Sequence, residues 1–536
     1  LKETVRRTVD DGRPHLVTVT GTAGVGKSRL LWELEKYLDG LPDSFHWRKG
    51  RCLSYPGASY GPVAEVAKHD ARILDDDPPT VARAKLATRL GELDLGADEV
   101  AVRDALEAVL AIGDDRERPR EVLFEAWRRY LAAMARRAPL VLIVEDLHWA
   151  DDGVLAFLDF LARWGEGPML ILGLGRHELL QQHPSWGGGL RNASIIELEP
   201  LGRDESEALM AGLLDGGVPP ALGERITALT EGNPLFAEEM VRMLVDRGTI
   251  RFADGRWQLA RPVDEVEIPG SVQAVLAARL DALPENEKRI AQDAAVIGRV
   301  FWDQLVAHIA RDDLGKTTER IRRLRVKDLI VPREPSSLAG AAEFGFRHVL
   351  IRDVAYESLP KRDRAVLHRE IAEWAERELA DRIEEFAELI ANHLAAAVAY
   401  EEEFDLEGGA DLQQLRRHAF AAAKRAARRA WAMSQLGSAY RWQTLAIELA
   451  PKIDTAPRDI ARLALDYGEI GFLLGGASQQ VVVAQRALEA MLALPEPEAE
   501  DVETSARLRG MLGSALFHEG DVEGSRAMLR EGLAQL

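Results

Sequence analysis

Short apolar runs alternate with longer stretches of helical periodicity over the first 200 residues of the chain. The run from His15 to Thr20 is rich in β-branched residues, as is typical of a strand buried on both faces of a sheet. The next stretch, Ser28 to Leu38, carries its apolar residues at helical spacing. Because strands that alternate with helices form parallel sheets, the pattern predicts an α/β fold, a parallel sheet wrapped by helices. The predicted strands are His15–Thr20, Phe45–Cys52, Leu140–Glu145, Met169–Leu174 and Ser194–Leu198.

The alternation is interrupted once and ends at Pro200. The interruption, Pro56 to Arg120, is mostly helical, and we expect it to lie at the periphery of the sheet. Beyond Pro200, the stretch from Arg203 to Arg247 predicts a small helical domain. Gly248 to Leu259 predicts a β-hairpin, because Asp254-Gly255 stands between apolar flanks.

Short helices followed by two strands are predicted between Pro269 and Leu359. The two strands, Leu329–Pro332 and Glu343–Phe346, bracket a turn rich in serine and glycine. This is the order of elements in a winged-helix domain, and we expect that fold here. From Lys361 onward the sequence is helix-like and rich in alanine, leucine, arginine and glutamate. The predicted domains are the P-loop ATPase domain at residues 1–200, a helical lid with a hairpin at 201–262, a winged-helix domain at 263–360 and an all-α repeat region at 361–536.

The C-terminal helical region contains a short internal repeat. Ala461-Arg462-Leu463 recurs 45 residues later as Ala506-Arg507-Leu508. Small residues on paired helices predict repeats of the tetratricopeptide kind, with an irregular helical bundle as the alternative. The offset exceeds the usual repeat length of about 34 residues, so we expect a longer loop, Leu494 to Glu503, between the copies. The other positions that recur at the same spacing are Gly468, Phe472 and Gly475, then Gly513, Phe517 and Gly520.

Composition and charge indicate in which compartment the protein works and which partners it is unsuited to bind. The single cysteine, Cys52, cannot form an internal disulfide, which favours a reducing, cytoplasmic location. The longest apolar runs, such as Leu140 to Val144, are too short to cross a bilayer, so no membrane anchor is expected. The net charge of −20 disfavours broad attraction to nucleic acid or anionic lipid. We also expect the sequence to be a fragment, because it opens within a helix and stops within the repeats.

The strand His15–Thr20 is followed by residues that fit the phosphate-binding loop pattern GxxxxGK[ST] at every fixed position. Glycines let the backbone curl so that successive N–H groups point at phosphate oxygens, helped by the positive end of the next helix. Lys27 is expected to neutralise the β and γ phosphates, and the Ser28 hydroxyl to take one position on Mg²⁺. The pattern therefore predicts a nucleotide-binding protein. The expected nucleotide contacts are Gly21, Thr22, Ala23, Gly24, Val25, Gly26, Lys27, Ser28 and Arg29.

Two further strands bring charged side chains to the same edge of the predicted sheet. Leu140–Glu145 ends in the carboxylates of Glu145 and Asp146, which a Mg·ATP site needs beside the phosphate loop. We assign the metal to Glu145 and the attacking water to Asp146, and the reverse order stays open. A strand ending at Leu174 delivers Arg176 to this edge, where a guanidinium can sense or stabilise the γ-phosphate. The expected catalytic residues are Lys27, Glu145, Asp146 and Arg176, and the expected metal ligands are Ser28, Glu145 and Asp146.

Other nucleotide and hydrolase motifs are absent from the sequence. No guanine-reading segment of the form Asn-Lys-x-Asp occurs, so adenine is the expected base. There is no GxSxG elbow, and the stretch from His177 misses HExxH because Gln181 stands where the second histidine would fall. Serine hydrolase and metalloprotease chemistry are therefore excluded, and the expected cofactors are ATP or ADP with Mg²⁺.

The order of these motifs resembles the STAND class of AAA-like signalling ATPases. The resemblance is to the bacterial branch that pairs this module with tetratricopeptide repeats and with a class III adenylate cyclase or a helix-turn-helix domain. It implies that Pro234 contacts the base and that His348 reaches the β-phosphate. Members more often have aspartate at the position of Glu145 and threonine at that of Leu174. The residues that carry the resemblance are the phosphate loop, Leu140–Asp151, Arg176 and Thr230–Phe236.

This resemblance implies an ATP-dependent molecular switch with slow, Mg²⁺-dependent hydrolysis. ADP would hold the sheet, lid and winged-helix domains closed. Exchange for ATP, prompted by an inducer ligand or protein on the C-terminal repeats, would open them for assembly into a homo-oligomer. The effector, a cyclase or a DNA-binding domain, is expected outside the present sequence.

Two other functions fit parts of the sequence. Basic residues cluster on one predicted helix, where they would contact DNA phosphates in a transcription regulator that acts through its own winged helix. A constitutive ATPase motor with arginines acting in trans is the second alternative. The basic residues are Arg320, Arg322, Arg323, Arg325 and Lys327.

Overall fold

Five parallel strands near the N-terminus form a single sheet. Their order across the sheet is β2-β3-β4-β1-β5, and every neighbouring pair is parallel. Each predicted strand is present with its ends displaced by at most one residue, which confirms the α/β fold. The strands are β1 (His15–Thr20), β2 (His46–Arg51), β3 (Leu140–Glu145), β4 (Met169–Leu174) and β5 (Ala193–Glu197). The structure, a computed structural model, describes residues 1–41, 44–53, 60–114, 116–214, 217–253, 256–260, 262, 269–404, 409–474 and 477–535.

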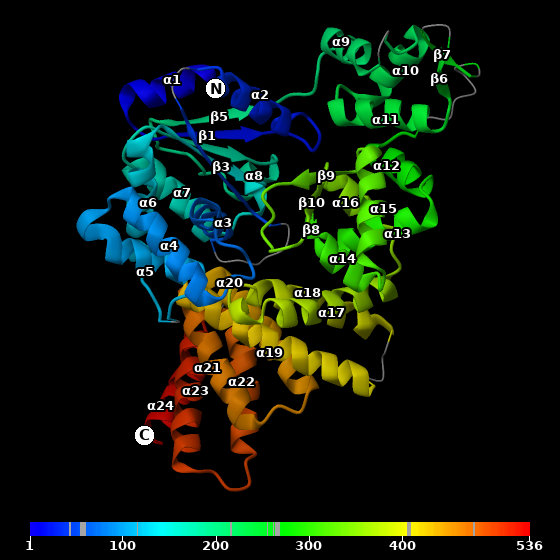
Figure 1. Cartoon of the computed structure of the whole chain (residues 1–536). Helices are drawn as coiled ribbons and strands as arrows, with labels where there is room; N and C mark the ends of the chain where they lie inside the picture. Colours follow the sequence, from blue (N-terminus) through cyan, green and yellow to red (C-terminus); the bar gives the residue numbers. More distant parts are fainter. Residues whose placement is uncertain are drawn as a thin grey trace.

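Helices cover both faces of this sheet (Figure 1). Val17 and Ile143 are buried against α1 and α2, while Leu16 and Leu142 are buried on the opposite face, towards α6 and α7. Because successive side chains of a strand point to opposite faces, a strand covered on both sides has to be apolar at nearly every position, as the central strands β3 and β4 are. The edge strands β2 and β5 carry more polar or exposed residues. The helices are α1 (Lys2–Asp11), α2 (Lys27–Asp39), α6 (Arg120–Arg137), α7 (Asp152–Trp164) and the short α8 (Glu178–Gln182).

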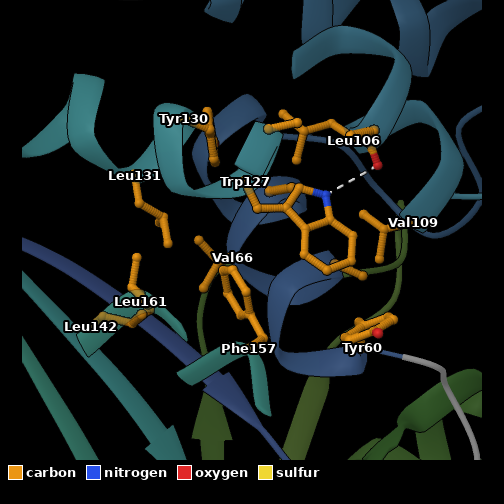
Figure 2. Packing of buried hydrophobic residues seen from close by; sticks show 14 of the residues in the cluster. Tyr60, Val66, Leu106, Val109, Trp127, Tyr130, Leu131, Leu142, Phe157 and Leu161 are labelled. Carbon is orange, nitrogen blue, oxygen red and sulfur yellow. Dashed lines mark hydrogen bonds between the residues drawn. The ribbon is translucent and has the colours of Figure 1, made fainter. Parts of the chain in front are cut away.

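The helices between β2 and α6 form one core with α6 and α7 (Figure 2). Trp127 of α6 stands at the centre of this core, and its Nε1 donates to the carbonyl oxygen of Ala105 at 3.2 Å. Its ring centroid lies 4.7 Å from that of Tyr60 and 5.3 Å from that of Phe157. The interruption in the sequence pattern is therefore a buried extension of one helical layer. Its helices are α3 (Gly61–Ala71), α4 (Pro79–Leu93) and α5 (Glu99–Val109).

A helical segment with a hairpin follows the sheet, at the residues of the predicted lid. Leu222, Ile226 and Met240 contribute to a small core of its own. The two strands of the hairpin pair antiparallel, while the predicted turn residues Asp254 and Gly255 lie outside the described residues. The elements are α9 (Arg203–Leu213), α10 (Pro220–Thr230), α11 (Pro234–Asp246), β6 (Ile250–Ala253) and β7 (Arg256–Leu259).

A three-stranded antiparallel sheet packed with helices comes next. Its strand order is β8-β10-β9. The two predicted strands are present as β9 and β10, whereas β8 was not predicted, because three residues are too few to show a pattern. The winged-helix assignment stays a prediction. The elements are α12 (Val272–Asp281), α13 (Glu285–Ile297), β8 (Val300–Trp302), α14 (Asp303–Ile309), α15 (Leu314–Val326), β9 (Ile330–Arg333), β10 (Glu343–Phe346) and α16 (Val349–Glu357).

The described residues from Lys361 onward form eight α-helices, each packed on the next. One continuous core extends from Leu276 to Leu449, so the domain boundary predicted at residue 360 falls inside a core. The helices are α17 (Lys361–Glu378), α18 (Ala387–Phe404), α19 (Ala410–Ala432), α20 (Leu436–Leu449), α21 (Pro457–Leu474), α22 (Ala477–Leu492), α23 (Ala499–His518) and α24 (Val522–Leu533).

Two of the repeated glycines lie at helix contacts. A β-carbon at Gly468 would lie 2.4 Å from Sδ of Met511, and one at Gly513 would lie 2.8 Å from Cγ of Leu529. The neighbouring helices approach this closely because both positions lack a side chain. The repeat therefore marks close packing positions on α21 and α23, which face α23 and α24 respectively. A third position of the repeat, Gly475, lies outside the described residues.

The loop between α22 and α23 is shorter than predicted. Helix α23 begins at Ala499, inside the predicted loop, because Oδ2 of Asp501 accepts from the backbone N–H of Glu498 at 2.8 Å and caps the helix. None of the helices in the described ranges is long and apolar enough to cross a membrane.

Candidate nucleotide-binding site

The phosphate loop connects β1 to α2 with the geometry that the sequence predicted. Gly24 and Gly26 have φ angles of 83° and 114°, which residues with a side chain rarely adopt. Nζ of Lys27 donates to the carbonyl oxygens of Gly21 and Thr22, both at 2.8 Å. Burial, followed by the charge of Arg176, lowers the pKa of Lys27 to about 8. The lysine is therefore held inside the loop, with Arg176 facing the same space.

Ser28 and Arg29, both expected to contact the nucleotide, have different surroundings in the first turn of α2. Ser28 is the second residue of the helix, directly after Lys27, and is exposed. Arg29 donates to Glu33 at 2.9 Å through Nε, and its guanidinium lies 4.3 Å from the ring centroid of Trp32. Arg29 thus points along the surface of α2, and its nucleotide contact stays a prediction.

Glu145 and Asp146 have different partners. Glu145, the last residue of β3, pairs with Lys49 at 3.0 Å and with Arg51 at 3.4 Å, both from β2. Burial opposes ionisation, but these two cations outweigh it and lower the pKa of Glu145 to about 2. Asp146 pairs with Arg299 and is among the charges that act on Lys27. Asp146 therefore faces the phosphate loop, whereas Glu145 is neutralised by the neighbouring strand.

Arg299 was missed by sequence reasoning. It lies in the turn between α13 and β8, and its carbonyl oxygen accepts from the backbone N–H of Phe346 at 2.9 Å. Its side chain reaches across to Asp146, directly after β3. No local motif surrounds it, so the only signal in the sequence is a lone arginine after Gly298.

His348 lies at the N-terminal end of α16, behind the same interface. Burial lowers its pKa to about 4; the carboxylate of Glu238 opposes this effect, while Arg347 and Arg299 add to it. The ring is therefore neutral at pH 7. Arg299 acts electrostatically on both Asp146 and His348, so the structure brings the predicted histidine to the neighbourhood of the site.

The Gly-Asn-Pro turn of the lid sits directly on the phosphate loop. Nδ2 of Asn233 donates to the carbonyl oxygen of Ala23 at 2.9 Å, and the backbone N–H of Leu235 donates to that of Gly24 at 3.3 Å. A β-carbon at Gly24 would lie 2.6 Å from Cβ of Leu235, which shows how close the contact is. Pro234 is the first residue of α11 and stands between these two contacts.

Asn233 serves two functions, because its Oδ1 also accepts from the N–H of Phe236 at 3.2 Å and caps α11. We expect Asn233→Ala to destabilise the docked lid by about 1–2 kcal/mol and to speed hydrogen–deuterium exchange in the phosphate loop. The matched control is Asp313→Ala, since Asp313 caps α15 through the N–H of Lys316 at 3.2 Å without touching the loop. Equal exchange in the loop of both variants would contradict the inter-domain contact.

The cations of the basic helix α15 lie among carboxylates. Most of its predicted DNA-contacting side chains are paired with carboxylates of the same region, which weakens the case for a phosphate-binding face. The pairs are Arg320 with Asp312, Arg322 with Glu319, Arg323 with Glu319 and Glu287, and Lys327 with Glu287.

Comparisons with known proteins agree with the geometry of the loop. Residues 1–172 match the family described as AAA ATPase domain, and residues 202–258 match a domain family of unknown function. An uncharacterized protein of Rhizobium meliloti (strain 1021) is 27% identical over 394 residues, which are 67% of this chain and 34% of that protein. The chain thus spans about a third of the length of this curated relative.

Two solved structures give distant matches. One is a signal transduction ATPase with numerous domains and a tetratricopeptide repeat sensor from Pyrococcus horikoshii, 12% identical, with a TM-score of 0.40 over 100% of this chain and 76% of that one. The other is the Orc1 protein of Aeropyrum pernix in complex with DNA, 12% identical, with a TM-score of 0.27 over 67% of this chain and 92% of that one. The family match and the β1–loop–α2 geometry together identify the N-terminal part of this chain as an AAA ATPase domain of the P-loop type, the domain of nucleotide-dependent ATPases.

Proposed function

We propose that this protein is an ATP-dependent molecular switch that ADP holds closed and ATP opens. The observation that carries the proposal is the ion pair between Arg299 and Asp146, because it joins the three-stranded sheet to the nucleotide site. A carboxylate that pairs with Arg299 is less available to a metal ion. Mg·ATP would therefore compete with Arg299 for Asp146 and release this contact.

The residues at the loop suit Mg²⁺ and a nucleotide. Mg²⁺ prefers oxygen ligands, which the Ser28 hydroxyl and the Asp146 carboxylate supply. When bound, Mg²⁺ would neutralise charge on the phosphates during slow hydrolysis. We assign the metal to Asp146 rather than to Glu145, since Lys49 and Arg51 already neutralise Glu145. The loop amides and Lys27 would hold the phosphates, with Arg176 as a γ-phosphate sensor.

The family resemblance supplies two more proposed nucleotide contacts. Pro234 would touch the adenine base, and His348 would reach the β-phosphate. Pro234 follows Asn233, which donates to the phosphate loop, and His348 lies within electrostatic reach of Arg299, the partner of Asp146.

A second network would keep the lid closed. Arg242 of α11 pairs with Asp328, which also pairs with Arg347 at 2.7 Å. Arg279 of α12 pairs with the buried carboxylate of Glu239, also on α11. These pairs fasten the lid to the three-stranded sheet region, so that the two would move as a unit when Arg299 leaves Asp146.

The output of the switch would come from an effector attached to this chain, a cyclase or a DNA-binding domain. An inducer ligand or protein would bind the C-terminal repeats and favour the open form. The open form would then assemble into a homo-oligomer, and the effector would respond to that assembly.

Arg299→Ala tests the proposal, because it removes the ion pair and leaves Asp146 free for metal. We expect the purified protein to retain ADP and the variant to release it about tenfold faster, the effect of one partly buried ion pair. Released nucleotide is identified by chromatography, and the rate is followed by exchange with a fluorescent ADP. Arg322→Ala, on an exposed arginine of the same region, is the control and should release ADP at the unaltered rate. If Arg299→Ala releases ADP at the same rate as the unaltered protein, the proposed role of the pair between Arg299 and Asp146 is contradicted.

A further inference from the structure

His148 lies beside the phosphate loop with both of its ring nitrogens unused. It is the middle residue of the short 3-10 helix η2 (Leu147–Trp149), which follows Asp146. Nδ1 and Nε2 are both buried, and neither has a hydrogen-bond partner within the part of the chain that the structure describes. By contrast, the buried ring of His368 uses Nδ1 towards His393 at 2.8 Å and Nε2 towards Tyr356 at 2.9 Å. Buried polar atoms without partners are unfavourable, so the ring of His148 points to a missing ligand.

The short helix is held firmly in place. Leu147 is fully buried, and a β-carbon at Gly173 would lie 2.7 Å from its Cδ2, so β4 fits closely around it. The backbone N–H of Trp149 donates to the carbonyl oxygen of Asp146 at 2.9 Å. The imidazole is therefore preorganised, and a ligand that reaches it does not have to order a loop.

The charges around the ring favour an anion. Lys27, Arg176 and Arg299 act on His148 from three elements, and Glu178 is the carboxylate that acts against them. An imidazole keeps at least one N–H donor in either protonation state, so the ring can donate to a phosphate oxygen. In a phosphate-loop site, the γ-phosphate is the anion that lies between the loop lysine and the end of β3.

We propose that the imidazole of His148 donates a hydrogen bond to the terminal phosphate of ATP, so that the site distinguishes ATP from ADP. This inference rests on the proposed switch and adds to it the residue that recognises the γ-phosphate of ATP. A change at His148 would also be felt by its neighbour Trp149, which lies between the nucleotide site and the three-stranded sheet. The ring of Trp149 lies 4.6 Å from that of His148 and, with Arg299 and Val300, lines a cavity of about 1030 Å³ between the ATPase domain and the three-stranded sheet.

The test compares two nucleotides on five proteins, the unaltered chain and four variants, by isothermal titration calorimetry in the presence of Mg²⁺. The nucleotides are ADP and the non-hydrolysable analogue adenylyl imidodiphosphate. Three variants are His148→Ala, His148→Gln and His148→Asn. An asparagine amide nitrogen falls near the position of Nδ1 and a glutamine amide nitrogen near that of Nε2, so one of the two should recover part of the affinity. His183→Ala, on a half-buried histidine that pairs with Asp152 at 4.0 Å, is the control.

We expect His148→Ala to bind the analogue about tenfold or more weakly, the value of one hydrogen bond to a charged group, and to bind ADP within about twofold of the unaltered protein. Recovery by one amide variant supports the donor role. An unchanged analogue affinity overturns the proposal, and so does an equal loss for both nucleotides, which would mark His148 as structural. If the unaltered protein binds neither nucleotide, the proposed switch itself fails, and this inference fails with it.

Discussion

Lys27→Ala is expected to weaken the binding of both ADP and ATP by about 100-fold, because two charge-assisted hydrogen bonds to phosphate are lost. In the structure, Nζ of Lys27 is held by carbonyl oxygens of its own loop and needs only a short rotation to reach a ligand. Equilibrium dialysis with radiolabelled nucleotide measures both affinities. Lys36→Ala is the matched control, since Lys36 lies on the same helix but packs 3.5 Å from the ring centroid of Trp32. Equal affinity of the two variants would contradict a nucleotide site at this loop.

The same lysine gives the binding a pH dependence. Its pKa in the structure is about 8, and a bound phosphate would raise that value by favouring the charged form. The complex then binds a proton more tightly than the free protein does. The affinity for nucleotide should therefore be highest below the pKa of the free protein, about 8, and should fall as the pH rises above it. Lys27→Ala should abolish this dependence between about pH 7 and 9, and a slope that persists in the variant would assign it to another group.

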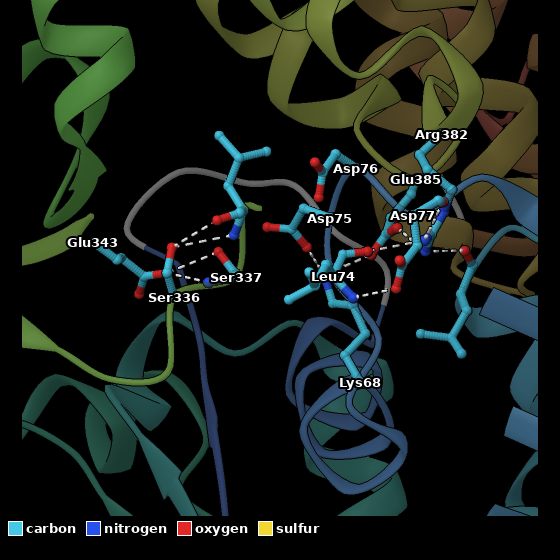
Figure 3. A network of polar contacts seen from close by, with 12 residues as sticks. Lys68, Leu74, Asp75, Asp76, Asp77, Ser336, Ser337, Glu343, Arg382 and Glu385 are labelled. Carbon is cyan, nitrogen blue, oxygen red and sulfur yellow. Dashed lines mark hydrogen bonds and ion pairs between the residues drawn. The ribbon is translucent and has the colours of Figure 1, made fainter. Parts of the chain in front are cut away.

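Arg382→Ala is expected to destabilise the protein by about 3–5 kcal/mol, the range for breaking a buried ion pair. The side chain of Arg382 is fully buried and joins the C-terminal helices to the ATPase domain (Figure 3). It pairs with Glu385 and donates to the carbonyl oxygens of Leu110 at 3.1 Å and of Leu74 at 3.4 Å. Without it, Glu385 keeps Lys68 as a partner at 2.7 Å, and the carbonyl oxygen of Leu74 keeps the N–H of Asp77 at 3.2 Å, but the carbonyl oxygen of Leu110 loses the guanidinium.

Urea unfolding, followed by circular dichroism, measures the effect of this change. Arg377→Ala is the control, because Arg377 is exposed, lies on α17 and pairs only with its neighbour Glu378 among the described residues. We expect the control to shift the midpoint little, since exposed ion pairs contribute less than about 1 kcal/mol. A midpoint of Arg382→Ala that matches that of the control would show that this junction does not hold the two regions together.

The acidic turn near this junction shows what the sequence could not reveal. Asp75 to Asp77 lie in the stretch that the sequence places at the periphery of the sheet, yet Asp75 is buried and its backbone N–H donates to the carbonyl oxygen of Ser337 at 2.6 Å. Oδ1 of Asp76 accepts from the N–H of Ala339 at 3.1 Å. The partners lie in a distant part of the chain, so no local pattern could have indicated them.

The phosphate loop was predictable because its chemistry is local. Consecutive residues from Gly21 to Ser28 supply the curled backbone, the lysine and the hydroxyl, and the flanking apolar periods fix a strand on one side and a helix on the other. The same holds for the carboxylates after β3, whose place at the sheet edge follows from the strand itself.

The sequence by itself therefore determined the parallel sheet, the loop that would bind phosphate and the residues at the strand ends. Only the tertiary structure decided that Glu145 pairs with β2 while Asp146 faces the loop, that Arg299 reaches Asp146, and that Asn233 docks the lid on the loop. The physical reason is that periodicity and backbone geometry act over a few residues, whereas ion pairs form between side chains that folding brings together from distant parts of the chain.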